Sequence, residues 1–185
     1  MIWANNSRRY GVVSQLAHWA SVLLVGIAWI LGSFGDDLPK GEVRELGEAI
    51  HVSAGELIGI LLIIRIVWLR ISRPPKDIPL PIGVVGKYAG KIAHITLYGL
   101  LFGVVATGIT FQFARGEALS VFGLYEILSP WVKDRTFAHS VKEIHEFLAN
   151  SLIILSIVHA SAALIHHFIF KDKTLTKMLP FSEKM

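Results

Sequence analysis

The 185-residue chain contains no cysteine. This absence excludes disulfide bonds, thiolate metal sites, iron–sulfur clusters and covalent haem attachment through a CxxCH motif. A cleavable signal peptide is not expected either. Arg8 and Arg9 precede an apolar run, but no small-x-small cleavage site follows, and His18 and Trp19 lie inside the run. The net charge is only +4, so we expect no nucleic-acid partner.

Apolar sequence, in contrast, is abundant. Hydrophobic residues make up 53% of the chain and the mean hydropathy is +0.56, whereas soluble domains are roughly 45–50% apolar. Four apolar segments, at about 12–34, 49–69, 88–113 and 146–168, are each long enough to cross ~30 Å of hydrocarbon. The sequence therefore predicts an all-α integral membrane protein, a four-helix bundle that forms a single domain over residues 1–185.

The connections between these segments differ in character. Residues 35–48 are the most acidic connection, and their EVRELGEAI part is expected to form a short surface helix. Residues 71–87 read as a linker because Pro74, Pro75, Pro79 and Pro81 forbid a continuing helix. Residues 114–136 are longer and more polar, and we expect an amphipathic surface piece at 119–128. The basic tail after residue 170 is expected at the membrane interface.

The distribution of basic residues predicts the orientation. If the N-terminus is cytoplasmic, that side holds most of the 18 Lys and Arg residues. The opposite side holds the remaining basic residues, Lys40, Arg44, Arg115, Lys133, Arg135 and Lys142, together with most of the acidic ones. The positive-inside rule then places both termini in the cytoplasm.

Histidines carry the strongest functional signal. His145 and His159 lie on the fourth segment, 14 positions apart, which is roughly 21 Å along a helix and within about 40° of one face. In the predicted topology His18 matches the depth of His159 at the inner side, and His51 matches His145 at the outer side. Each pair suits bis-imidazole ligation of a haem b iron. Polar side chains satisfied within a bundle, or a zinc site, are the alternatives.

Other polar residues in or near the spans are candidates for supporting roles. Arg65 lies 14 positions after His51 and needs a counter-ion, which a haem propionate or a lipid phosphate would supply. Arg115 leaves the third segment on the outer side, where it is a candidate for outer propionates. His94 is expected near the inner haem, on a propionate or a quinone carbonyl. We place a quinone site near Trp19, His94 and His166, although interfacial snorkelling also explains His166.

The ordered set of motifs resembles the bacterial cytochrome b561 family of small di-haem membrane proteins, over nearly the whole chain. More distantly, it is similar to the haem-bearing gamma subunits of formate dehydrogenases and nickel-iron hydrogenases. The matching pieces are Arg9-Tyr10, Leu16-Ala17-His18-Trp19, His51-Val52-Ser53-Ala54-Gly55, Ala93-His94, Leu97-Tyr98, His145-Glu146, His159-Ala160, Ala162-Ala163-Leu164, His166-His167-Phe168, Lys171-Asp172-Lys173-Thr174-Leu175 and Met178-Leu179-Pro180.

The resemblance implies a function. It implies a protein of the bacterial inner membrane with two haems b, which oxidises superoxide on the periplasmic side and reduces ubiquinone in the membrane. Arg115, Lys133, Arg135 and Lys142 lie where a basic patch would steer an anionic substrate. A second hypothesis is an electron-transfer subunit that links a periplasmic dehydrogenase or cytochrome to the quinone pool. A third is a four-helix transporter or sensor whose histidines bind metal or protons.

Overall fold

The computed structural model describes residues 3–75 and 83–180. Each of its four long helices is long and apolar enough to cross a membrane. The predicted all-α fold is thereby confirmed as a candidate four-span membrane bundle. The described elements are α1 (Val12–Phe34), η1 (Gly35–Asp37), α2 (Glu42–Ile71), α3 (Gly83–Ala114), β1 (Leu119–Val121), β2 (Tyr125–Ile127), α4 (Arg135–Phe168) and η2 (Thr176–Met178).

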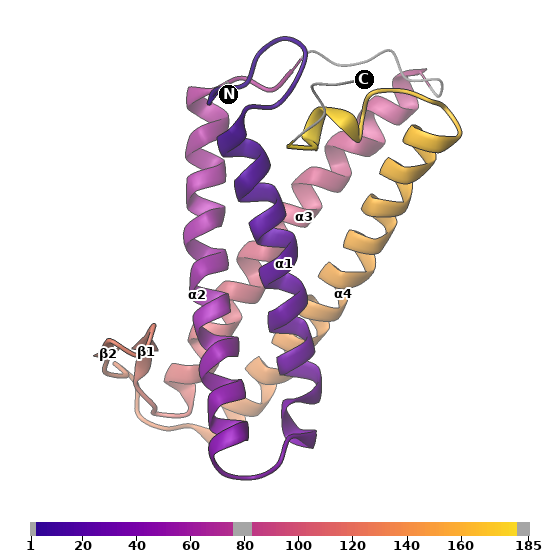
Figure 1. The fold of residues 1–185 in the computed structure, drawn as a ribbon. Coiled ribbons are helices and arrows are strands. Elements are labelled where there is room, and N and C mark those ends of the chain that lie inside the picture. Colours follow the sequence, from indigo (N-terminus) through magenta and orange to yellow (C-terminus); the bar gives the residue numbers. More distant parts are fainter. Residues whose placement is uncertain (1–2, 76–82, 181–185) are drawn as a thin grey trace.

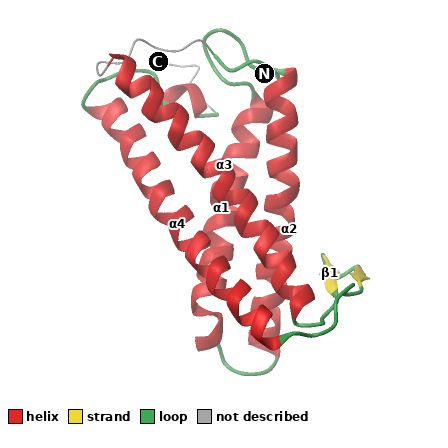
Figure 2. Ribbon diagram, turned by 180° about the vertical axis from the view of Figure 1, so that it is seen from behind, coloured by secondary structure: helices red, strands yellow, loops and turns green. Residues whose placement is uncertain are grey.

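The long helices associate as two pairs (Figure 1). α1 packs along α2, α3 packs along α4, and α2 and α3 join the pairs, whereas α1 and α4 make little contact. Both ends of the described chain lie at the same end of the bundle as η2, which we call the terminal end. The α1–α2 connection and the β1–β2 hairpin lie toward the opposite end, the hairpin end, as the reverse view in Figure 2 also shows.

The apolar core is small and central. Ile58, Leu62, Leu101 and Leu152 form the buried cluster. Many large apolar side chains instead point outward, and Phe102 on α3 and Phe147 on α4 are 67% and 71% exposed. Hydrocarbon tails are as apolar as these side chains, so a membrane removes the cost of exposing them. The outward-facing apolar surface therefore fits a bundle that is surrounded by lipid.

Two helix starts differ from the sequence-based expectations. The EVRELGEAI stretch does not form a separate surface helix, because α2 begins at Glu42 and continues without a break to Ile71. α3 begins at Gly83, so residues 83–87 are helical and do not belong to the linker. Pro74 and Pro75 follow α2 as expected, whereas Pro79 and Pro81 lie outside the described residues.

Residues 119–127 form a β-hairpin. β1 pairs with β2 in antiparallel register, and the Leu124 amide donates to the Val121 carbonyl across the turn at 2.9 Å. Phe122 and Gly123, the first two of the three residues that join the strands, have φ of 50° and 71°, which lie in the left-handed region typical of tight turns. The Phe122 amide donates to Oε2 of Glu56 at 3.0 Å. The hairpin is thus attached to α2 near the middle of that helix.

Candidate functional site

At the hairpin end, a histidine from α2 faces a histidine from α4. The ring centroids of His51 and His145 are 6.2 Å apart, and the rings are inclined at 73°. Two imidazoles that share one metal ion through bonds of about 2 Å have ring centres roughly 6 Å apart. The separation of these rings therefore leaves room for one metal ion between them.

Both rings are held by backbone carbonyls of neighbouring helices. Nδ1 of His51 lies 2.8 Å from the Ala28 carbonyl oxygen of α1. Nδ1 of His145 lies 3.0 Å from the Val104 carbonyl oxygen of α3 and 3.1 Å from the Thr107 hydroxyl. A carbonyl accepts but does not donate, so Nδ1 carries the proton in each ring. Each Nε2 then keeps its lone pair for a metal, the arrangement typical of metal-ligating histidines.

Glycines provide the space for these two rings. A Cβ added at Gly32 of α1 would lie 2.9 Å from Cε1 of His51, and one added at Gly108 of α3 would lie 3.3 Å from Cε1 of His145. Both distances are shorter than an ordinary van der Waals contact between carbon atoms. All four helices therefore shape this site: α2 and α4 through the histidines, and α1 and α3 through the acceptor carbonyls and the glycines.

A second histidine cluster lies toward the terminal end. The ring centroids of His94 on α3 and His159 on α4 are 5.2 Å apart. His18 on α1 interacts electrostatically with both of them and with Arg65 on α2. Within the described part of the chain, the ring nitrogens of these three histidines have no hydrogen-bond partner. Four helices again converge, but here they supply three imidazoles and a guanidinium.

α2 supplies two further donors near this cluster. The Arg65 guanidinium stacks over the Tyr98 ring of α3 at 4.9 Å and forms no ion pair with a described residue. One turn further along the helix, the indole N–H of Trp68 is buried and has no acceptor among the described residues. A buried donor without an acceptor is costly, so an acidic group that binds at this end would meet two suitable partners.

The C-terminal segment closes the terminal end. Nδ1 of His166 pairs with Oδ2 of Asp172 at 2.6 Å, and both side chains are largely buried. Burial acts to raise the pKa of the Asp172 carboxyl, but hydrogen bonds from Thr174 and His166 outweigh it and hold the pKa below its usual range. The Trp19 indole donates to the Met178 carbonyl at 2.9 Å. Trp19 and His166 therefore both contact this segment.

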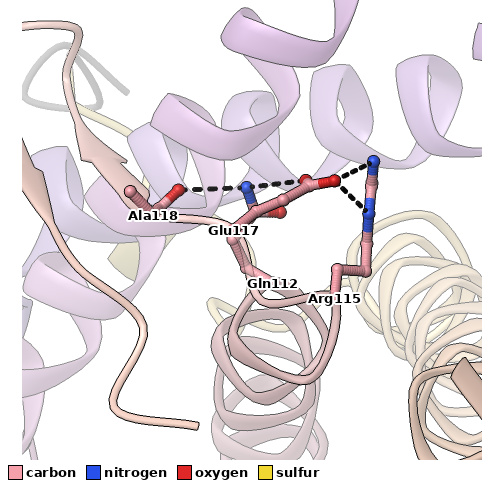
Figure 3. A network of polar contacts seen from close by, with 4 residues as sticks. All are labelled: Gln112, Arg115, Glu117 and Ala118. Carbon is pink, nitrogen blue, oxygen red and sulfur yellow. Dashed lines mark hydrogen bonds and ion pairs between the residues drawn. The ribbon is translucent and has the colours of Figure 1, made fainter. Parts of the chain in front are cut away.

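Arg115, at the hairpin end, is already engaged (Figure 3). Its Nη2 lies 2.8 Å and its Nε 3.0 Å from Oε1 of Glu117, while the guanidinium rests over the Phe111 ring. Gln112 donates to the Ala118 carbonyl and to the same carboxylate. The positive charge of Arg115 is thus largely balanced by Glu117, which lies in the same connection.

The connections at the hairpin end carry more acidic than basic residues. Lys142 pairs with Glu146 at 3.5 Å, whereas Lys133 and Arg135 have no ion-pair partner among the described residues. The acidic residues of this end are Asp36, Asp37, Glu42, Glu45, Glu48, Glu117, Glu126, Asp134, Glu143 and Glu146. The basic ones are Lys40, Arg44, Arg115, Lys133, Arg135 and Lys142.

The structure thus brings the sequence-predicted histidines together at two places. His51 meets His145, and His159 meets both His18 and His94, with the His94 ring in direct contact. Sequence reasoning missed the acceptor carbonyls, because every residue has one, and it missed Asp172. The signal for Asp172 was present, since it is the one acidic residue within the basic tail segment KDKTLTK.

The fold and these sites define a class of protein: a four-helix membrane bundle whose helices present grouped imidazoles toward each end of the interior. The sequence matches the family profile described as prokaryotic cytochrome b561 over residues 9–181. The chain therefore belongs to the prokaryotic cytochrome b561 family, whose members are membrane electron-transfer proteins that carry haem b.

Relatives cover almost the full length of the chain. Cytochrome b561 homolog 2 of Escherichia coli K12 is 35% identical over 97% of this chain and 95% of its own length. A probable superoxide oxidase, CybB of Yersinia pestis, is 31% identical over 94% and 97%. Cytochrome b561 homolog 1 of Escherichia coli K12 is 30% identical over 93% and 97%.

Proposed function

We propose that the protein binds two haems b and carries electrons from a donor at the hairpin end to ubiquinone at the terminal end. His51 and His145 ligate one iron, and His18 and His159 ligate the other. The observation that carries the proposal is the His51–His145 pair, in which backbone carbonyls hold both Nδ1 atoms and leave both Nε2 atoms to a metal. When bound, the haems supply one-electron redox chemistry, with potentials set by axial ligands and burial.

The proposed orientation places the terminal end in the cytoplasm of a bacterium and the hairpin end in the periplasm, with the bundle spanning the inner membrane. The excess of basic residues at the terminal end supports it. Asp172 is the one carboxylate at that end among the described residues, and it is already paired with His166. Four spans keep both termini on the same side.

Several residues at the terminal end are suited to support this reaction. Arg65 and Trp68 offer donors for a propionate, and His94 offers a donor for a propionate or a quinone carbonyl. His166 is the candidate proton donor to the quinone. Its Nδ1 is held by Oδ2 of Asp172, so Nε2 is the ring nitrogen left for the quinone. Trp19 fixes the C-terminal segment beside it.

Superoxide is the donor that we propose first. Two superoxide anions each lose one electron and leave as dioxygen, and ubiquinone takes up two electrons and two protons to become ubiquinol. Support comes from a relative that is named a probable superoxide oxidase, at 31% identity over nearly the whole chain. Lys133 and Arg135, which are not ion-paired with any described residue, are the candidates for steering the anion.

Stopped-flow mixing of oxidised protein with superoxide tests this proposal. Haem absorbance should show reduction within the mixing experiment, and ubiquinone should reoxidise the protein and appear as ubiquinol. The double variant Lys133→Gln/Arg135→Gln should slow the reduction at low salt, and Lys40→Gln, in the other connection of the same end, should not. Protein that stays oxidised after repeated superoxide pulses would reject superoxide as the donor.

A second donor class is favoured by one observation, the acidic hairpin end. A small basic cytochrome or the basic face of a periplasmic dehydrogenase would be attracted there, whereas an anion such as superoxide would not. Reduction by a basic donor protein should slow steeply as ionic strength rises. If superoxide fails and such a donor reduces the haems with this salt dependence, the protein is an electron-transfer subunit of the quinone pool.

A further inference from the structure

Away from both histidine clusters, the terminal end contains a pocket of about 440 Å³ that is lined by both polar and apolar groups. It forms where the N-terminal segment crosses the end of α2, and it is lined by Ala4, Asn5, Asn6, Ser7, Ile71, Ser72, Arg73 and Pro74. We propose that this pocket binds the phosphate headgroup of an anionic phospholipid, with an acyl chain lying along α2 below it.

The two walls of the pocket are fixed to each other. The Asn5 amide donates to Oγ of Ser72 at 2.8 Å, and Nδ2 of Asn5 donates to the Ser72 carbonyl at 3.0 Å. Oδ1 of Asn5 accepts from the Gly11 amide and from the Ser14 hydroxyl. Ser72 is only 6% exposed. The pocket is therefore preformed, which lowers the entropic cost of binding a ligand.

Its free polar groups are donors. Oδ1 of Asn6 accepts from the amides of Arg8 and Arg9 at 2.8 and 2.9 Å, which fixes that atom as the oxygen. Nδ2 of Asn6, the Ser7 hydroxyl and the Arg73 guanidinium donate to no described residue. A phosphate diester carries acceptor oxygens and a negative charge, so it matches this set of donors.

The positive charge around the pocket also favours an anionic ligand. Arg8, Arg70 and Arg73 form no ion pair with any described residue. The one described carboxylate of the terminal end, Asp172, is bound to His166. Basic pockets at the end of a membrane helix attract anionic headgroups, at a strength that corresponds to about fivefold in affinity for each Lys or Arg near the surface.

The position of the pocket, at the end of an apolar helix face, favours a lipid over a free phosphate as the ligand. α2 ends at Ile71, on the pocket wall. Ile63, Val67 and Ile71 lie four residues apart along the same face of this helix and are 64%, 50% and 69% exposed. This exposed apolar stripe runs from the pocket toward the bilayer centre. Trp3, 66% exposed in the N-terminal segment, is a residue type enriched at membrane interfaces.

The test measures lipid retained by the purified full-length protein in detergent, by native mass spectrometry, with phosphatidylglycerol and phosphatidylcholine of equal chain length. We expect a clear preference for phosphatidylglycerol. Arg73→Gln should weaken its retention about fivefold, and Asn6→Ala should weaken it further in combination. Lys91→Gln removes one exposed positive charge from α3 at the same end and serves as the matched control. Its retention of phosphatidylglycerol should change by less than about twofold.

Three results would overturn the proposal. Equal retention of both lipids would remove the headgroup preference. Equal losses in Arg73→Gln and Lys91→Gln would mean diffuse attraction without a site. Inorganic phosphate that displaces phosphatidylglycerol at millimolar concentration, together with equal binding of dihexanoyl and long-chain phosphatidylglycerol, would assign the pocket to free phosphate. Because none of these measurements uses electron transfer, they are independent of the proposed redox function.

Discussion

The two ends of the bundle hold their histidines in different ways. At the hairpin end, a backbone carbonyl of another helix fixes each ring, and a glycine leaves space beside it. At the terminal end, His18, His94 and His159 converge without a hydrogen bond to any described residue, beside Arg65. The first site is preorganised by backbone atoms, whereas the second presents three imidazoles, one more than the two axial positions of a haem iron. We infer that the hairpin end holds one fixed haem, and that the terminal end holds a haem with an exchangeable quinone beside it.

Removing a ligand from α4 gives the largest expected effect. His145→Ala should lose the haem of the hairpin end and keep the other, and His159→Ala should do the reverse, because α4 supplies one imidazole to each site. Haem content per protein should halve in both variants, and the spectra and redox titrations of the remaining haem should differ. The same remaining haem in both variants would contradict the proposed pairing.

At the terminal end, His18 and His94 are the two candidates for the iron ligand that partners His159. The ring centroids of His94 and His159 are 5.2 Å apart, yet we propose His18 as the ligand. His18→Ala should therefore lose the terminal-end haem, and His94→Ala should retain it with altered quinone reduction. Haem content and low-temperature spectra decide, and loss of haem in His94→Ala with retention in His18→Ala would exchange the two roles.

Filling the space beside the hairpin-end rings should have a smaller effect that is confined to that end. Gly32→Ala places a Cβ 2.9 Å from His51, and relief of such crowding typically costs about 1–3 kcal/mol. We expect reduced occupancy of the hairpin-end haem in thermal release assays. A Cβ added at Gly26 on the same helix meets no atom of a described residue within 4 Å, so Gly26→Ala is the matched control. Equal behaviour of the two variants would show that the ring tolerates movement.

Replacing Arg65 should change the redox potential of one haem without affecting haem binding. Its positive charge stabilises a reduced haem, so Arg65→Gln should lower the potential of the terminal-end haem by about 60 mV, the equivalent of a tenfold change in a one-electron equilibrium. The hairpin-end potential should stay constant. Arg70→Gln, five positions further along α2 and exposed, is the control. A redox titration unchanged by Arg65→Gln would reject contact with a propionate.

The smallest effect concerns the C-terminal segment. The pKa of Asp172 is lowered in the folded protein from its ordinary value of 3.8, so its pair with His166 stabilises the closed segment above that value. The stabilisation is lost as pH falls through the lowered folded pKa. Asp172→Asn should open the segment at neutral pH, which faster amide exchange of residues 172–179 would report. Nε2 of Gln15 donates to the carbonyls of Lys177 and Leu179 at 3.3 Å. Unchanged exchange would show that Trp19 and Gln15 suffice to hold the segment.

The sequence predicted what depends on side-chain type and spacing. Four apolar segments predict four helices, and the 14-residue spacing between His145 and His159 places them toward opposite ends of α4. It could not show the Ala28 and Val104 carbonyls, because acceptor geometry belongs to the packed backbone. The 119–127 hairpin was missed because its strands are only three residues long and because Phe122, instead of the usual Gly or Asn, occupies a left-handed turn position. The pairing of Arg115 with Glu117 was missed because charge was counted without partners.

The position of α4 in the chain also has a consequence for biogenesis. Synthesis proceeds from the N-terminus, so His18 and His51 enter the membrane early as two incomplete half-sites, while α4 is the last of the four helices to be made. Neither proposed cofactor can then be fully ligated before the whole bundle has been inserted. Ribosome-bound chains that stop before residue 135 would be colourless, and both haems would load in the same window after release.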